Sequence, residues 1–483
     1  MPTKPTKPEA EKTSTRAVNW GDFREHLATA DKDGQRRWLY PRKPVGRWYR
    51  WRTWMSWVLI AIMFAGPFIR IGGNPLLMFN LIERKFSILG RIFWPEDTII
   101  FAVAMLIFFA GIMIFTTAFG RLWCGWTCPQ TIMMEMVFRK IEYLIEGDSH
   151  QQRALDAAPW NFSKTTKKVL KHSVFFLLSF VIGNTLLAYL IGSDALLRII
   201  TDDPRQHLVG LTFMILFTLV FYGIFARFRE QACTFICPYG RFQSALLDEN
   251  TMVVAYDYKR GEKRAPWKRE QRLDLRQSEG LGDCVNCRQC VAVCPTGIDI
   301  RDGIQMECVN CTACLDACDA VMDKIGRPRG LIRYASLNGI EHGQPLRFTA
   351  RMKLYASVLT GLIALFLILV FTRAEVETMF LRAPGAMFQT MANGRISNLY
   401  TVKVVNKSSR DLPVQFRLEN AEGGITVMGA PTFVVPKDRV RQASVLVELN
   451  PTHLTGRTTK LKIGVYSGER RLETVSTSFV GPR

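Results

Sequence analysis

The sequence lacks the signatures of nucleotide-binding enzymes. Neither G-x-G-x-x-G nor G-x4-G-K-S/T occurs, so the chain has no evident dinucleotide, flavin or P-loop site of its own. The region after Cys318 contains no cysteine and no C-x-x-C-H motif, which excludes covalent haem attachment there.

The N-terminus lacks the short apolar core of a signal peptide. It is instead rich in Pro, Lys and Thr, a composition typical of disordered segments. We therefore expect residues 1–52 to form a disordered, basic tail that stays in the cytoplasm.

Acidic residues are scarce relative to basic ones: 42 Asp and Glu stand against 63 Lys and Arg, which gives a formal net charge of +21. In a soluble protein this excess would suggest nucleic-acid binding. Here the basic residues lie between apolar runs of about twenty residues, as the positive-inside rule predicts for a membrane protein. We therefore expect a membrane protein with no nucleic-acid partner.

Five apolar runs are long enough to cross a bilayer as helices. They cover residues 53–71, 98–120, 173–193, 208–226 and 354–372. Lys and Arg number 13 up to Arg52, 8 from Gly120 to Ser173 and 20 from Arg227 to Lys353. The two short connections, Arg70–Asp97 and Gly192–His207, contain 4 and 2. This alternation predicts that the N-terminus and the cysteine-rich segment are cytoplasmic and that the C-terminus is periplasmic.

Eight of the twelve cysteines form two runs with the spacing C-x2-C-x2-C-x3-C, which is the bacterial two-cluster pattern. The first run is Cys284, Cys287, Cys290 and Cys294, and the second is Cys308, Cys311, Cys314 and Cys318. In this pattern the fourth cysteine of each run ligates the cluster of the other run. We therefore expect one [4Fe-4S] cluster on Cys284, Cys287, Cys290 and Cys318 and a second on Cys308, Cys311, Cys314 and Cys294. Two zinc sites are the alternative, but they leave the third and fourth cysteines of each run unexplained.

The other four cysteines form two C-x3-C-P motifs, each just after an apolar run. These are Cys124 and Cys128 before Pro129, and Cys233 and Cys237 before Pro238. The prolines disfavour helix at the preceding cysteine, so each motif is predicted to end or bend a helix. Thiolates select Cu(I), zinc or iron–sulfur clusters, and four thiols at one bilayer depth could form one metal or redox site. For Met113, Met133, Met134 and Met136, packing is the better explanation. His172 is a weaker candidate ligand and is better explained as a histidine at the membrane interface.

Apolar and polar residues alternate near the C-terminus, as in LPVQFRLEN and RQASVLVELN. Strands of that length between turn-forming residues predict a small β-sandwich over residues 393–483. Because it has no redox-active residue, we expect it to serve docking or structure.

The C-x3-C-P motifs, the double cluster between the fourth and fifth apolar runs and the C-terminal β-domain together resemble the CcoG/FixG/RdxA family. The resemblance covers nearly the whole chain and implies an assembly factor for cbb3-type cytochrome c oxidase that reduces Cu(II) to Cu(I). It also implies that the C-terminal module is immunoglobulin-like and that oxidase subunits or copper chaperones are partners. The family's membrane cysteine motifs correspond to Cys124, Cys128, Cys233 and Cys237, which we take as the catalytic, copper-binding residues. NapH-type quinol dehydrogenase subunits are also similar, but they lack the fifth span and the β-domain.

We therefore expect an α-helical polytopic protein of the bacterial inner membrane, with five spans, an inserted α+β ferredoxin domain and an all-β immunoglobulin-like sandwich. The expected order is a tail (1–52), a four-helix membrane domain (53–226), a cytoplasmic connector (227–275), the ferredoxin domain (276–330), the fifth span (354–372) and the sandwich (393–483). The expected function is copper reduction with electrons from an unidentified donor. A quinone-linked relay to a periplasmic acceptor and a redox-sensing assembly scaffold are the alternatives.

Overall fold

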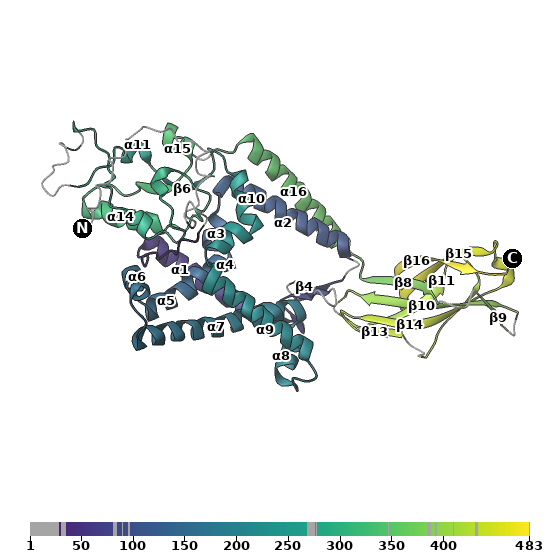
Figure 1. Ribbon diagram of the computed structural model, residues 1–483. Coiled ribbons are helices and arrows are strands. Elements are labelled where there is room, and N and C mark those ends of the chain that lie inside the picture. Colours follow the sequence, from purple (N-terminus) through teal and green to yellow (C-terminus); the bar gives the residue numbers. More distant parts are fainter. Residues whose placement is uncertain are drawn as a thin grey trace. The chain divides into compact units, whose positions relative to one another are not determined.

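The computed structural model (Figure 1) describes residues 29, 35–80, 85–88, 90–94, 97–267, 276, 278–345, 347–383, 388–391, 394–408, 410–429 and 433–482. Most of the predicted disordered tail therefore lies outside the described residues. The chain divides into two compact units. The first contains residues 1–70, 78–80 and 104–363, and the second contains residues 71–77, 81–103 and 364–483.

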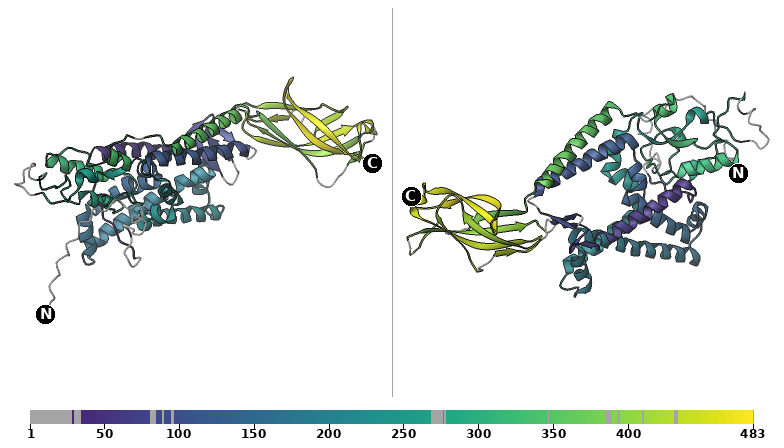
Figure 2. Two further views of the ribbon diagram at one scale, coloured as in Figure 1. Left: turned by 90° about the horizontal axis from the view of Figure 1, so that it is seen from above. Right: turned by 180° about the vertical axis from the view of Figure 1, so that it is seen from behind.

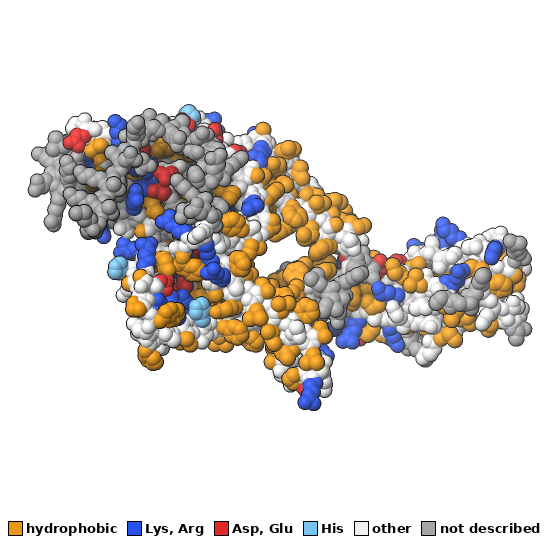
Figure 3. Space-filling model, in the orientation of Figure 1, with side chains coloured by type: hydrophobic (Ala, Val, Ile, Leu, Met, Phe, Trp, Pro, Cys, Tyr) orange, Lys and Arg blue, Asp and Glu red, His pale blue; other side chains and the backbone are white. Residues whose placement is uncertain are grey.

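Four helices in the described residues are long and apolar enough to cross a membrane. They are α2 (Thr98–Phe119), α7 (Phe162–Ile191), α9 with its π-helical continuation η4 (Leu208–Gly223 and Ile224–Phe228) and α16 (Ala350–Phe371). In the apolar 18-residue window that qualifies each helix, between 0% and 44% of the window is buried inside the protein. Hydrophobic side chains accordingly cover the visible surface of α16 (Figure 3), as expected of a helix that contacts lipid.

The first predicted span differs from the structure in its bounds. Helix α1 covers Arg47–Ala65 and not residues 53–71, and it is not among the four helices that qualify as spans by length and composition. Its first turns carry Arg47, Arg50 and Arg52, which lowers the hydropathy of the helix. The chain leaves the helix at Gly66 and enters a short strand, β1 (Arg70–Ile71). Membrane crossing by α1 therefore stays a prediction.

Short helices surround both C-x3-C-P motifs. After α2 come α3 (Leu122–Trp126), α4 (Pro129–Ile132), η3 (Met133–Phe138), α5 (Arg139–Ile145) and α6 (Ser149–Ala157). Later in the chain, α8 (Ser193–Thr201) follows α7. Around the second motif, η5 (Ala232–Ile236) and α10 (Pro238–Leu246) follow η4. Cys128 and Cys237 are the N-cap residues of α4 and α10, and both have an extended backbone. The prolines after them occupy the first helical turn, where no backbone N–H is needed. The prediction that these motifs interrupt the helices is confirmed.

The cysteine-rich domain is framed by two antiparallel strands, β6 (Val253–Tyr256) and β7 (Ile332–Ala335). Between them lie α11 (Tyr258–Gly261), α13 (Gln289–Ala292), η6 (Ile300–Asp302) and α14 (Ala313–Lys324), and α15 (Leu337–His342) follows. The predicted limits of 276–330 are therefore too narrow. All four residues of β6 are buried, so this strand has no alternating pattern by which sequence could reveal it.

The second unit contains a β-sandwich (Figure 2). One sheet has the order β12-β14-β10-β8, with β9 also paired to β10, and the other has the order β13-β11-β15-β16. The strands are β8 (Val376–Arg382), β9 (Gln389–Thr390), β10 (Ile396–Asn406), β11 (Leu412–Leu418), β12 (Gly423–Val427), β13 (Phe433–Val435), β14 (Val440–Leu449), β15 (Thr458–Ser467) and β16 (Arg470–Val480). A one-turn 3-10 helix, η7 (Pro451–His453), follows β14. Inward residues of both sheets, such as Val402, Val447 and Ile463, form one buried core.

The sandwich begins before its predicted start at residue 393. Strand β8 pairs antiparallel with β10, although it follows α16 almost directly. Its outward residues Met379 and Leu381 are exposed and apolar, so the strand does not show the polar–apolar alternation that predicts strands. The same unit contains three further short strands, which no pattern predicted: β2 (Asn74–Pro75), β4 (Lys85–Ile88) and β5 (Arg91–Phe93). Most of β3 (Leu77–Asn80) belongs to the first unit.

A buried ion cluster joins the start of α2 to the sandwich within the second unit. Asp97 Oδ2 lies 2.5 Å from Arg373 Nη2, and Asp97 Oδ1 lies 2.6 Å from Lys407 Nζ. Lys407 Nζ also lies 2.7 Å from Glu377 Oε2. Burial by itself would raise the pKa of Asp97, but the hydrogen bonds from Lys407 and Arg373 lower it below its usual range.

Replacing Asp97 by Asn should destabilise this unit by about 3 kcal/mol, because it leaves two buried cations without their shared carboxylate. The measurement is amide hydrogen exchange on β8 and β10 in the full-length protein. Because the folded pKa of Asp97 is lowered, its contribution is complete above the unfolded pKa of about 4 and is lost as pH falls through the folded value. The control is Asp194→Asn, which breaks an exposed pair with Arg70. Equal changes in the exchange of β8 and β10 in Asp97→Asn and Asp194→Asn would contradict the stabilising role assigned to Asp97.

Candidate iron–sulfur and thiol site

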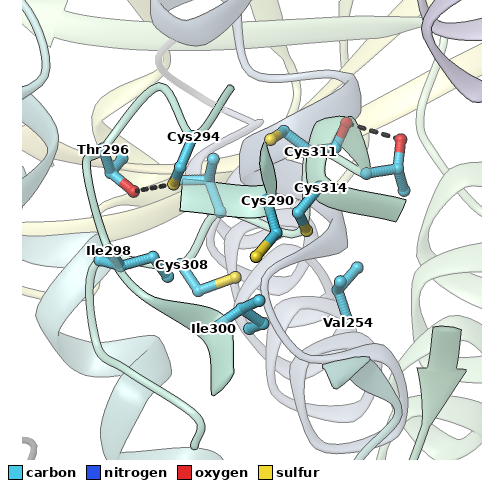
Figure 4. Close-up of a pocket in the computed structure, with 11 residues that line it drawn as sticks. Val254, Cys290, Cys294, Thr296, Ile298, Ile300, Cys308, Cys311 and Cys314 are labelled. Carbon is cyan, nitrogen blue, oxygen red and sulfur yellow. Dashed lines mark hydrogen bonds between the residues drawn. The ribbon is translucent and has the colours of Figure 1, made fainter. Parts of the chain in front are cut away.

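The cysteines of the two runs gather into two groups of four. A cavity with an empty volume of about 350 Å³ is lined by Cys294, Cys308, Cys311 and Cys314, and Cys290 also lines it (Figure 4). The thiols of Cys308 and Cys314 interact electrostatically with Cys294, and Cys314 also interacts with Cys290. The remaining cysteines form the other group, in which Cys318 interacts with Cys284, Cys287 and Cys290. We call these the Cys311 group and the Cys287 group.

The two loops have the same unusual backbone conformation. Positive φ angles occur immediately before and after the second cysteine of each run, at Asn286 and Arg288 and at Asn310 and Thr312. Outside glycine such angles are uncommon, and asparagine tolerates them best. In the second loop this curvature brings Cys308, Cys311 and Cys314 to the wall of one cavity. Helix α14 then places Cys314 and Cys318 one turn apart. Cys314 belongs to the Cys311 group and Cys318 to the Cys287 group.

The surroundings of the Cys311 group fit an iron–sulfur cluster. The cavity wall contains Val254, Ile298 and Ile300 in addition to the sulfurs, so water has little access (Figure 4). Burial raises the pKa of Cys308 to about 12 and that of Cys311 to about 11 in the iron-free chain. Iron must therefore displace the protons of these thiols, and cluster binding is coupled to folding of the loop.

Among the described residues, no group of three or more His, Cys, Asp or Glu side chains is arranged as a single-ion metal site.

The four cysteines of the C-x3-C-P motifs nevertheless lie in one neighbourhood. The thiol of Cys233 interacts electrostatically with Cys124, Cys128 and Cys237. Burial raises the pKa of Cys233 to about 12, and the guanidinium of Arg121 opposes this effect. Cys124 is buried, and its thiol donates to Gln243 Oε1 at a distance of 2.9 Å. The structure therefore brings together cysteines that are more than 100 residues apart in the sequence.

The first thiol motif packs directly on the loop of the Cys311 group. Cys124 lies in one apolar cluster with Val309 and Cys311. Gly125 lies so close to this loop that a Cβ atom added to it would be 2.2 Å from the carbonyl oxygen of Val309. Trp126 Nε1 also donates to the carbonyl oxygen of Asn310 at 3.3 Å. This contact connects the thiol site with one particular cysteine group.

Two buried arginines hold this contact in place, and sequence reasoning did not identify either. Arg52 Nε of α1 donates to the carbonyl oxygen of Gly125 at 2.6 Å, and Arg121 Nη1 donates to the carbonyl oxygen of Met306. Both arginines are at most 5% exposed. In the sequence they resemble the other basic residues at the ends of apolar runs, and only the buried contacts distinguish them.

A second set of buried charges joins the flanks of the two thiol motifs. Arg229 binds Glu142 through both of its terminal nitrogens, at 3.1 and 2.6 Å. Arg139 Nη1 lies 2.6 Å from Glu135 Oε1, and Arg139 Nη2 lies 3.5 Å from Glu230 Oε2. Glu135, Arg139 and Glu142 follow the first motif, whereas Arg229 and Glu230 precede the second. The network therefore fixes the motifs relative to one another.

The weaker ligand candidates take part in packing. Met133 and Met134 belong to a buried cluster with Phe138 and Phe175. His172 Nδ1 lies 2.9 Å from the hydroxyl oxygen of Tyr222, so this ring nitrogen is already engaged.

Comparisons with protein families give three matches along the chain. Residues 228–337 match a 4Fe-4S dicluster domain, and residues 101–145, which include Cys124 and Cys128, match a 4Fe-4S binding domain. Residues 366–482 match the IG-like fold at the C-terminus of FixG. The chain is therefore an iron–sulfur protein with an immunoglobulin-like C-terminal domain, as the sequence predicted.

Three characterised relatives support one assignment. The chain is 33% identical to protein RdxA and 32% identical to protein RdxB of Cereibacter sphaeroides, over 80% and 84% of this chain and 83% and 87% of those proteins. It is 37% identical to the nitrogen fixation protein FixG of Rhizobium meliloti, over 63% of this chain and 58% of that protein. The chain belongs to the FixG/RdxA family of iron–sulfur electron-transfer proteins.

Proposed function

We propose that this protein is a cupric reductase of the bacterial inner membrane, which supplies Cu(I) for assembly of a cbb3-type cytochrome c oxidase. The observation that carries the proposal is the packing of Cys124 and Gly125 against Val309 in the loop of the Cys311 group. The oxidase as destination rests on the family resemblance alone. Oxidase subunits or copper chaperones would then receive the copper.

We propose that the Cys311 group and the Cys287 group each hold one [4Fe-4S] cluster. When bound, these clusters supply single electrons at low potential. Cys287 is the exposed member of its group, so the Cys287 group is the side open to an electron donor. The Cys311 group lies against the thiol motif and is the side from which electrons leave.

The four thiols of Cys124, Cys128, Cys233 and Cys237 are proposed to receive copper as the substrate. Thiolates are soft ligands that stabilise Cu(I) over Cu(II), so binding there favours the gain of one electron by Cu(II). Burial raises the pKa of Cys124, and the guanidinium of Arg121 opposes this effect.

The orientation is part of the same proposal. The surplus of Lys and Arg in residues 1–52, 120–173 and 227–353 favours a cytoplasmic position for the cysteine groups and the thiols. The β-sandwich would then lie in the periplasm, with copper reduced on the cytoplasmic side.

The variant Cys294→Ser tests whether the fourth cysteine of the first run ligates the cluster held by the second run. Cys294→Ser should change the same EPR signal of the reduced protein that Cys308→Ser changes, because both residues belong to the Cys311 group. It should leave intact the signal that Cys284→Ser changes. If Cys294→Ser instead matches Cys284→Ser, each run holds its own cluster and the proposed ligand sets are wrong.

Alanine at positions 233 and 237 tests the thiol site. The double variant Cys233→Ala/Cys237→Ala should lose copper reduction, because two of the soft ligands are gone, yet keep about eight iron atoms per chain. Copper reduction is followed with a Cu(I)-specific chelator under anaerobic conditions. Phe235→Leu, at an exposed position between the two cysteines, is the matched control. Undiminished reduction by the cysteine variant would remove the role assigned to this motif.

The variant Gly125→Ala tests the contact between the first C-x3-C-P motif and the loop of the Cys311 group. Gly125→Ala should displace the loop at Val309, shift the EPR signal of the Cys311 group and slow copper reduction about 10- to 100-fold. Gly111→Ala is the control, because a Cβ atom there has no neighbour within 4 Å. An unchanged signal and rate in Gly125→Ala would show that this contact does not govern electron transfer.

A further inference from the structure

A basic groove lies between the start of α1 and helix α5, away from the cysteines. It has an empty volume of about 1300 Å³. Its lining includes the cations Lys43, Arg50 and Lys140 and the aromatic residues Tyr49, Trp54 and Tyr143. All of these residues belong to the first unit. The reactions proposed above use none of them.

Among the residues that the structure describes, the side chains of the three cations of the groove, Lys43, Arg50 and Lys140, have no carboxylate partner. Lys140 Nζ instead lies 5.5 Å from the ring centre of Tyr49. Asp148, which also lines the groove, accepts hydrogen bonds from the backbone N–H groups of Lys43 at 2.9 Å and Ser149 at 2.7 Å.

Crowding of like charges makes the groove receptive to an anion. Desolvation, together with the neighbouring cations Arg52 and Lys43, lowers the pKa of Lys140. A bound anion would reverse this effect, since an opposite charge favours the protonated form of lysine. The groove therefore provides both the space and the charge for a phosphate-sized anion.

The walls of the groove combine aromatic and apolar side chains with its cations. Helix α1 is basic and aromatic up to Trp54 and apolar from Trp57 onward. Trp51, Trp54 and Trp57 are between 54% and 72% exposed, and tryptophan is enriched at membrane–water interfaces. On the other wall, Leu144 is 85% exposed and presents an apolar surface beside the cations.

We propose that this groove binds an anionic phospholipid, with the headgroup phosphate between Lys43, Arg50 and Lys140 and the acyl chains along Trp54 and Leu144. Basic pockets beside membrane helices bind such headgroups, and each basic residue near the surface adds to the affinity. The inference does not depend on the proposed copper chemistry.

Lipid binding in this groove would also stabilise the cysteine-rich domain. The backbone N–H groups of Trp48 and Tyr49 donate to the carboxylate of Asp316, at 3.1 and 2.7 Å. Asp316 lies on α14 between Cys314 and Cys318. A headgroup that holds the start of α1 therefore acts on the helix that contributes to both cysteine groups.

The test is native mass spectrometry of the full-length protein in detergent, titrated with dioleoylphosphatidylglycerol, dioleoylphosphatidylcholine or inorganic phosphate. The wild type should prefer phosphatidylglycerol over phosphatidylcholine by about tenfold or more, and Lys43→Gln/Lys140→Gln should lose this preference. Lys43→Arg/Lys140→Arg should retain it. The matched control is Lys167→Gln/Lys353→Gln, which removes two exposed lysines outside the groove and should behave as the wild type.

Iron content, measured for every variant, shows that the protein is folded. The proposal is overturned if the glutamine variant keeps the lipid preference, or if the arginine variant loses it while retaining its iron. It is also overturned if inorganic phosphate binds as tightly as phosphatidylglycerol, because the groove is then a site for a soluble anion. Failure of copper reduction in the wild type would leave this result unaffected.

Discussion

The structure of the proposed redox site depends on one close contact, between Gly125 and the carbonyl oxygen of Val309. Only a residue without a Cβ atom can lie there, since a Cβ atom would be 2.2 Å from that oxygen. The contact joins the first C-x3-C-P motif to the loop of the Cys311 group, and Cys124 consequently packs beside Cys311. Arg52 and Arg121 donate hydrogen bonds to the backbones on both sides of the contact. Thiols and cluster ligands from distant parts of the chain thereby share one small volume.

Interruptions of the membrane helices present the thiols to that volume. Each motif ends a helical segment, and a proline starts the next one, so the second cysteine of each pair is extended. Arg229, just before the second motif, has a φ of 54°, which is unfavourable for arginine, and its buried ion pair with Glu142 holds it there. Burying charges is costly, so this network is better understood as fixing geometry than as adding stability. The same applies to Asp97 in the second unit. Its two cationic partners, Arg373 and Lys407, lie just after α16 and just after β10.

The sequence predicted those features that repeat with a fixed period or spacing. The spacing of the cysteines in the two runs indicated iron–sulfur ligation, the apolar runs indicated the helices, and Pro129 and Pro238 indicated the helix breaks. It did not predict β6 or β8, because one strand is wholly buried and the other exposes Met379 and Leu381. It could not predict the roles of Gly125, Arg52 or Gln243 either. Their importance comes from contacts between residues 73 to 184 positions apart, which leave no local pattern.

The central claim is that electrons pass from the cysteine domain to copper at the four thiols. The most direct measurement is EPR of anaerobically purified, dithionite-reduced protein, with metal analysis, before and after addition of Cu(II). The account predicts about eight iron atoms per chain, loss of the reduced-cluster signals when Cu(II) is added, and recovery of the copper as EPR-silent Cu(I). Reduced-cluster signals that persist with Cu(II) but disappear with a quinone would contradict it and identify a quinone-linked relay.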